Sequence, residues 1–243
     1  MIIDAHNHVG GPDKGDNMKQ SPEEIISSMD KAGIDKSVIF PFNEIKPGVS
    51  FSLANDYIAS AAKKYSERLI GFARLDPNYE VKAIREMERA INELGLRGIK
   101  LHPTSQKFSL DNPCVLKIVK KASKLNVPVI FDSGKKLSPP EKIGVLAELF
   151  PGAKIIMAHM QGDNYLEIAE KFDNVYLGTT GMFEINTLNE AFQRLGAEKL
   201  IMGSDSPYTP QEVEIKKFDF IPGITREEKA KILGQNMSKI LEL

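Results

Sequence analysis

Residues 2–33 read IIDAHNHVGGPDKGDNMKQSPEEIISSMDKAG and contain a short apolar strand, a long polar loop and an amphipathic helix. The expected strand covers Ile2–His6, and the loop over Val9–Gln20 is rich in glycine, proline and aspartate. The helix starts after Ser21, an N-cap that precedes a proline and two acidic residues, and it ends at Ala32-Gly33. This order of strand, loop and helix is the repeating unit of parallel α/β proteins.

The same unit recurs along the whole chain. We expect strands at Ile2–His6, Ser37–Phe40, Leu69–Arg74, Gly98–His102, Val127–Phe131, Lys154–Ala158, Val175–Leu177 and Leu200–Met202. The expected helices are Pro22–Ala32, Leu53–Tyr65, Glu80–Leu94, Pro113–Leu125, Pro140–Phe150, Tyr165–Lys171, Asn186–Leu195 and Arg226–Leu241. This alternation predicts an α/β protein, a (β/α)8 TIM barrel that forms one domain over residues 1–243. An open doubly wound sheet is the alternative, but no glycine-rich phosphate-binding sequence follows the first strand.

Loop lengths support the barrel independently. Segments that lead from a helix to the next strand are short, as in Gly33–Lys36, whereas segments after strands are long, as in Val9–Gln20 and Gly203–Gln211. Barrel enzymes build their active sites from the loops that follow the strands. We therefore expect the functional residues at the carboxyl ends of the strands.

Composition narrows the class of protein. The 243 residues include 32 basic and 33 acidic side chains, for a formal charge of -1, which argues against general binding to nucleic acid or to an anionic membrane. The single cysteine, Cys114, cannot form an internal disulfide. No apolar run approaches the ~20 residues that cross a bilayer. We expect a cytoplasmic protein with a small-molecule substrate, and the sequence leaves open whether it forms homo-oligomers.

All four histidines lie at or just after the end of an expected strand. His6 and His8 are two residues apart in the first strand, so both imidazoles project from one face, ~6–7 Å apart at the backbone. That spacing lets two ring nitrogens bind one ion at ~2.0–2.1 Å each. Asp205 follows the last strand, which barrel closure places beside the first strand. A capping aspartate and a hydrogen-bonded histidine pair are the structural alternatives, but the combination favours a metal site.

Other charged or titratable residues at strand ends are further candidates. His159 follows the sixth strand and could bind a metal ion or contact the attacking water. Lys100 and His102 share one face of the fourth strand, and a buried lysine there suits a substrate anion, an ion pair or a modified ligand. Arg74 ends the third strand, where it could hold a substrate carboxylate or form a structural ion pair.

Together these motifs resemble the amidohydrolase superfamily. The resemblance is to the amidohydrolase-related branch that includes aminocarboxymuconate semialdehyde decarboxylase and pyrone dicarboxylate lactonase. It rests on the motifs Ile3–His8, Gly98–Pro103, Ala158–Met160, Gly203–Pro207 and Ile232–Asn236. It implies a distorted TIM barrel that binds one or two divalent ions through His6, His8 and Asp205. In that resemblance Asp205 handles protons, and His159 polarises the water or the substrate.

The fifth strand departs from the pattern of the branch. There the resemblance implies a metal-binding histidine, but this sequence has Asp132 before Ser133-Gly134. An aspartate can ligate zinc or manganese and would shift the preference toward manganese. It could equally cap the following loop, or mark a site that has lost its activity. Lys100 lies on the strand where binuclear members carry a carboxylated lysine, although a mononuclear site is commoner in this branch.

The sequence predicts a metal-dependent hydrolase, with zinc as the first expectation and manganese as the second. Its substrate would be the amide, ester or lactone of a small carboxylated molecule. Asp205, assisted by His159, would take a proton from a metal-activated water, while Lys100, His102 and Arg74 would hold the anionic part of the substrate. One alternative is a non-oxidative decarboxylase on the same scaffold. Another is a barrel that has lost catalysis and binds a ligand.

Overall fold

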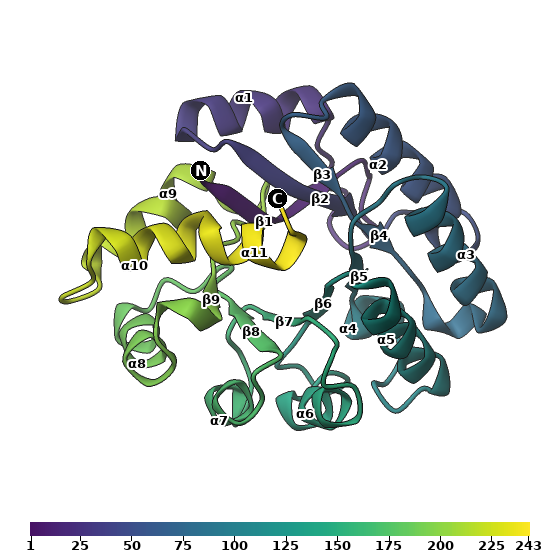
Figure 1. Cartoon of the computed structure of the whole chain (residues 1–243). Helices are drawn as coiled ribbons and strands as arrows, with labels where there is room; N and C mark the ends of the chain where they lie inside the picture. Colours follow the sequence, from purple (N-terminus) through teal and green to yellow (C-terminus); the bar gives the residue numbers. More distant parts are fainter.

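In the computed structural model, which describes all residues 1–243, parallel strands form the centre of the molecule and helices surround them (Figure 1). One run of strands is β1 (Ile3–Val9), β2 (Lys36–Pro41) and β3 (Leu69–Gly71). The other run is β4 (Ala73–Arg74), β5 (Ile99–Leu101), β6 (Val129–Asp132), β7 (Ile155–Ala158), β8 (Val175–Gly178) and β9 (Leu200–Ile201). β3 and β4 are two halves of one barrel strand interrupted at Phe72, so nine named strands make eight barrel strands.

Backbone hydrogen bonds close the barrel between its first and last strands. Ala5 donates its N–H to the carbonyl of Met202 at 3.0 Å, and Asp205 donates to His6 at 2.8 Å. His8 then donates to Ser206 at 2.8 Å. The expected TIM barrel is confirmed, and its closure brings the loop after β9 against β1.

The outer helices largely follow the expected pattern. α1 (Pro22–Ala32), α5 (Pro113–Leu125) and α7 (Tyr165–Lys171) have the expected bounds. α2 (Ser52–Lys64), α3 (Val81–Asn92), α6 (Pro140–Leu149) and α8 (Ile185–Leu195) differ at their ends by one or two residues. The expected helix at Arg226–Leu241 consists of α10 (Arg226–Ala230), a π-helical turn at Lys231–Gln235 and α11 (Asn236–Leu241).

Three features differ from the sequence expectation. α4 (Pro103–Gln106) is helical where we expected irregular loop, and α9 (Gln211–Lys216) is a helix in a stretch to which we assigned no element. β1 continues past the expected end at His6 to Val9, with an irregular register between Asp4 and Asn7. His8 therefore lies within the strand rather than beyond it. None of the helices has the length and apolar character needed to cross a membrane.

The barrel interior is divided into an apolar half and a polar half. Below the carboxyl ends of the strands it is filled by apolar side chains that include Ile3, Phe40 and Ile130, and α11 covers its base with Met237 and Ile240. A larger apolar cluster fills the space between the strands and the outer helices. The polar residues of the interior are left at the carboxyl ends, where the loops after the strands meet.

Candidate metal centre and active-site cavity

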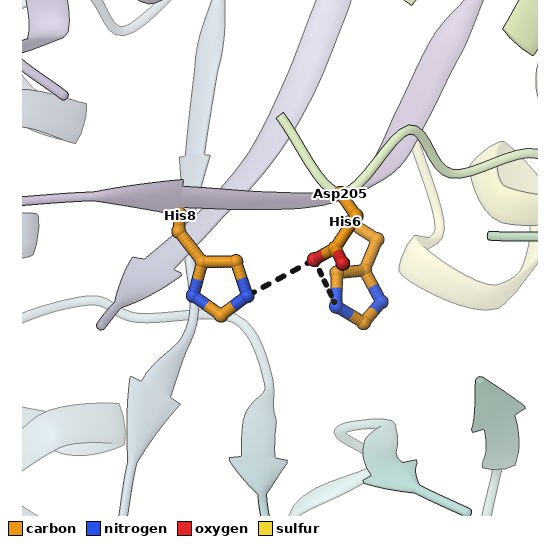
Figure 2. Close-up of side chains that lie close together, drawn as sticks. All are labelled: His6, His8 and Asp205. Carbon is orange, nitrogen blue, oxygen red and sulfur yellow. Dashed lines mark ion pairs between the residues drawn. The ribbon is translucent and has the colours of Figure 1, made fainter. Parts of the chain in front are cut away.

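Three side chains converge at the point where the barrel closes. The Nε2 atoms of His6 and His8 lie 3.4 Å and 3.1 Å from Oδ1 of Asp205. The donor atoms of these three residues all lie within 4.8 Å of one another. Figure 2 shows both imidazoles, carried by β1, turned toward the carboxylate from the loop after β9. The expected proximity of His6, His8 and Asp205 is therefore observed.

The geometry and charge of this triad fit a divalent ion. With metal–ligand bonds of about 2.1 Å, two ligands at tetrahedral or octahedral angles lie about 3.0–3.4 Å apart, which is the spacing observed between Asp205 and each histidine. Burial lowers the pKa of both imidazoles, well below the usual range for His6, so each ring is neutral. Burial opposes ionisation of Asp205, but its hydrogen bond with His8 lowers the pKa to about 2. Neutral imidazoles and a carboxylate are the protonation states that bind metal.

Backbone conformation aims the catalytic candidates into the barrel mouth. Asp205 has φ of 64° and His159 has φ of 75°, both in the left-handed region that non-glycine residues rarely adopt. The N–H of Asp205 donates to the carbonyl of His6, so this turn directs the carboxylate back toward β1. Residues held in such conformations concentrate at functional sites.

The side chain of Asp4 links β1, which carries His6 and His8, to the loop that carries Asp205. Its buried carboxylate accepts hydrogen bonds from the N–H of His6 and from both the N–H and the hydroxyl of Ser204, the residue before Asp205. The side-chain amide of Gln211, on α9, donates a further bond at 2.9 Å. Burial raises the pKa of Asp4, although these bonds favour its ionised form. The carboxylate thus fixes β1 against the loop that carries Asp205.

Replacing Asp4 by alanine is expected to lower both stability and metal affinity. The change leaves the buried donors of Ser204, His6 and Gln211 without their acceptor, at a cost of about 2–4 kcal/mol in the free energy of unfolding. Urea unfolding and metal titration measure the two effects. Asp30→Ala removes an exposed acid that pairs with Arg68 and should change stability by under ~0.5 kcal/mol. Unchanged metal affinity in Asp4→Ala would show that Asp4 does not position the triad.

The triad lies on the wall of a cavity of about 250 Å³. All eight residues expected from the sequence line this cavity: His6, His8, Arg74, Lys100, His102, Asp132, His159 and Asp205. Five further lining residues were not expected from the sequence: Asp13, Asn43, Ser105, Lys135 and Tyr208. Each of the five lies in a loop or short helix after a barrel strand, which is the only signal that could have indicated it. The candidate site is thus one polar cavity at the carboxyl ends of the strands.

Asp132 contacts histidines rather than the triad. Its Oδ2 lies 3.3 Å from Nε2 of His102 and 3.3 Å from Nε2 of His159, and its Oδ1 lies 2.9 Å from Nζ of Lys135. Burial alone would raise its pKa, but the hydrogen bond from His159 and the positive charge around it lower the pKa well below its usual range. The structure does not bring Asp132 or His159 into the group of three converging donors. A ligand role for either residue remains a prediction.

Lys100 lies directly beside the triad. Its Nζ is 3.1 Å from Nε2 of His6 and 4.9 Å from the centre of the Phe40 ring, and the residue has no exposed surface. No carboxylate lies within 4.0 Å of its ammonium group. Burial lowers the pKa of Lys100 to about 7, although the charges of Asp132 and Asp205 favour the protonated form. The structural ion pair considered for Lys100 is therefore absent.

Arg74 is also buried without an acidic partner. Its guanidinium donates to three neutral acceptors: Oε1 of Gln106 at 3.3 Å, the carbonyl of Pro41 at 3.1 Å and the hydroxyl of Ser105 at 2.7 Å. Burial lowers its pKa to about 10, so the side chain stays charged at neutral pH. The structural ion pair considered for Arg74 is not formed, because no carboxylate lies within 4.0 Å.

Comparison with known proteins gives consistent matches. The family model described as amidohydrolase matches residues 3–243. The chain is 24% identical over 211 residues to a gamma-resorcylate decarboxylase from Polaromonas sp. strain JS666, covering 64% of this chain and 65% of that protein. It is 26% identical over 246 residues to a 2-amino-3-carboxymuconate-6-semialdehyde decarboxylase from Dictyostelium discoideum, covering 82% of this chain and 68% of that protein. The match thus spans about two thirds of the length of each curated relative.

A solved structure has the same fold. It is a dihydroxybenzoic acid decarboxylase from Polaromonas sp. JS666 with bound manganese and the inhibitor 2-nitroresorcinol. The TM-score is 0.78 at 20% sequence identity, and the alignment covers 100% of this chain and 97% of that chain.

Proposed function

Because this chain belongs to the amidohydrolase family, we propose that it is a metal-dependent enzyme that decarboxylates a small carboxylated molecule without oxidation. Both curated relatives are decarboxylases by name, which favours the alternative drawn from the sequence over the hydrolase expected first. The barrel and the family membership fit either chemistry. The preference for decarboxylation comes from the relatives and from the arrangement of the cavity.

The proposal rests on the position of His159, an imidazole beside the triad that can donate a proton. The ring centres of His159 and His6 are 5.3 Å apart, and Asp132 holds His159 through the contact at 3.3 Å. A substrate carboxylate bound at the triad would therefore lie next to an imidazole of fixed orientation. Decarboxylation needs these two elements: a positive site for the developing charge, and an acid that protonates the carbon.

The reaction balances without an oxidant. The bond between the substrate carbon and its carboxylate breaks, carbon dioxide leaves, and the electron pair stays on the carbon. His159 donates a proton to that carbon, and solvent water restores the proton to the imidazole. The hydroxide that is left combines with carbon dioxide as bicarbonate. Asp132 keeps the ring in place throughout, and Asp205 holds its position through its hydrogen bonds to β1.

The residues that would hold the metal ion are His6, His8 and Asp205. The chemistry that a divalent ion supplies at such a triad is positive charge, which binds the carboxylate and stabilises the negative charge that develops as carbon dioxide leaves. Zinc and manganese both accept two imidazoles and a carboxylate. The related solved structure with bound manganese supports testing manganese beside zinc.

We expect carbon dioxide release that depends on added metal and on His159. Chelator-treated protein is reloaded with zinc or manganese and supplied with aromatic and unsaturated carboxylic acids labelled with ¹³C at the carboxyl group. In D2O, the carbon that carried the labelled carboxyl group should gain one deuterium when that group leaves. His159→Gln should lower turnover by about 10²–10⁴-fold and leave metal content unchanged.

Two outcomes would contradict the proposal. Metal-dependent cleavage of esters, amides or lactones without release of label would indicate the hydrolase expected first from the sequence. Full activity of His159→Gln would remove the proposed acid. Chelated protein without added metal is the control for uncatalysed loss of carbon dioxide.

A further inference from the structure

Two of the most buried cations in the molecule line the cavity without an acidic partner. Arg74 is 1% exposed and Lys100 is fully buried. The register of β4 and β5 pairs these two residues, so they lie side by side on neighbouring strands. Buried charges in proteins are normally paired, because an unpaired charge loses its hydration without compensation. Carboxylates that include Asp13 and Asp132 favour the charged form of Arg74 from beyond 4.0 Å, but none contacts its guanidinium, which can therefore bind an acidic ligand.

Three other buried or partly buried cations each pair with an acid. Lys217, which is 4% exposed, pairs with the fully buried Glu214. Arg89 pairs with Glu86 and Asp56, and Lys135 pairs with Asp132. Arg74 differs because its contacts are a carbonyl, a hydroxyl and an amide oxygen, none of which carries charge. Each of its two terminal nitrogens makes one of these bonds and so retains a second N–H for a ligand.

The position of Arg74 separates it from the triad. Its partners belong to the end of β2 and to α4, and it makes no hydrogen bond to His6, His8 or Asp205. An acidic group held by Arg74 is thus a different group from one held at the triad. A buried guanidinium would also stabilise a carboxylate in the ground state and oppose its loss, so Arg74 suits a group that the product retains.

The charges of the cavity wall also favour a ligand with two acidic groups. When Lys100 is protonated, the formal charges of the wall balance, with Arg74, Lys100 and Lys135 against Asp13, Asp132 and Asp205. A divalent ion at the triad would leave an excess of two positive charges, which a dianion neutralises. The cavity of about 250 Å³ is small for a ligand pocket, so the dianion must be compact.

Building on the proposed decarboxylation, we propose that the substrate is a small dicarboxylate. One carboxylate is lost at the triad. The second is bound by the two terminal nitrogens of the Arg74 guanidinium and is kept in the product. Ser105 and Gln106 on α4 hold the guanidinium in place, and Lys100 adds positive charge on the adjacent strand.

Ligand binding tests the inference separately from catalysis. Isophthalate and benzoate, which share a ring and differ by one carboxylate, are titrated into the metal-loaded protein by calorimetry. We expect isophthalate to bind about 10- to 100-fold more tightly than benzoate, and we expect Arg74→Gln to abolish that difference. Arg68→Gln, which removes a surface arginine paired with Asp30, should leave the preference intact.

Equal affinities for the two acids, or an unchanged preference in Arg74→Gln, would overturn the inference. If Arg74→Gln does not fold, Arg74→Lys replaces it, because lysine keeps the charge but cannot donate two parallel hydrogen bonds to one carboxylate. An unchanged preference for isophthalate over benzoate in Arg74→Lys overturns the inference. If the wild type takes up no metal, the proposed function fails, whereas the Arg74 site is still tested by benzoate binding to metal-free protein. In metal-free protein, Arg74→Gln should weaken the binding of benzoate by about 10-fold or more.

Discussion

Replacing His6 and His8 together by alanine is expected to abolish divalent-metal binding and to lower turnover by about 10³-fold or more. The two imidazoles supply two of the three converging donors, so the double variant keeps only Asp205 of that group. The barrel should remain folded, because its apolar interior lies below the triad. Elemental analysis of protein purified without chelator or nickel affinity measures metal content, and circular dichroism checks the fold.

A matched control uses a third histidine of the same cavity. His102 lies beside Asp132 and outside the triad, so His102→Gln should keep its metal content. If the double variant retains metal, the ion binds elsewhere. If folded wild type takes up neither zinc nor manganese, the metal-dependent function fails, and the ligand-binding barrel considered from the sequence becomes the better description.

Replacing Lys100 by methionine is expected to stabilise the metal-free protein by about 4–5 kcal/mol at pH 6. Burial lowers the pKa of Lys100 from 10.5 to about 7, and lowering a pKa by one costs the protonated form about 1.4 kcal/mol. The unfolded chain binds the proton more tightly than the folded chain does. The cost of the buried ammonium is therefore complete below about pH 7, shrinks as the pH rises, and vanishes above the unfolded pKa.

Urea unfolding of chelator-treated wild type and Lys100→Met at two pH values measures this cost. The stabilisation should fall to about 2 kcal/mol at pH 9, because the folded lysine is then neutral and the unfolded lysine is still protonated. Methionine has nearly the same length and adds no charge, so packing changes little. The same stabilisation at both pH values, or a loss of stability at pH 6, would contradict the assignment of a buried, unpaired ammonium.

The fold could be predicted because eight strand–helix units leave a clear periodic pattern. The short helices α4 and α9 could not, since four and six residues are too few to show a helical period. The predicted end of β1 at His6 was also wrong, because His6, Asn7 and His8 are polar and end the apolar pattern of the strand. They remain in the strand because Asn7 and His8 pair with β2, while the loop after β9 bonds to the backbone of His6 and His8 on the other side.

The triad could be predicted because barrel closure alone places strand eight beside strand one. The partners of Asp132 could not, although His102 and His159 directly follow the neighbouring strands, because their contact depends on side-chain rotamers. Asp13, Asn43 and Tyr208 reach the cavity through irregular loops, for which no periodicity relates sequence to direction. The missing acidic partner of Arg74 is likewise a property of the folded interior and not of the sequence.

The joining of β1 to the loop after β9 also determines when in the life of the chain this site exists. His6 and His8 are made first, and the third donor is made some two hundred residues later. At an elongation rate of about 5–20 residues per second, a nascent chain spends about ten seconds or more with an incomplete set of donors. An ion can therefore bind all three donors only after Asp205 has been synthesised and β9 has closed the barrel. Once loaded, an ion that links the two ends would clamp a very long loop and slow its reopening.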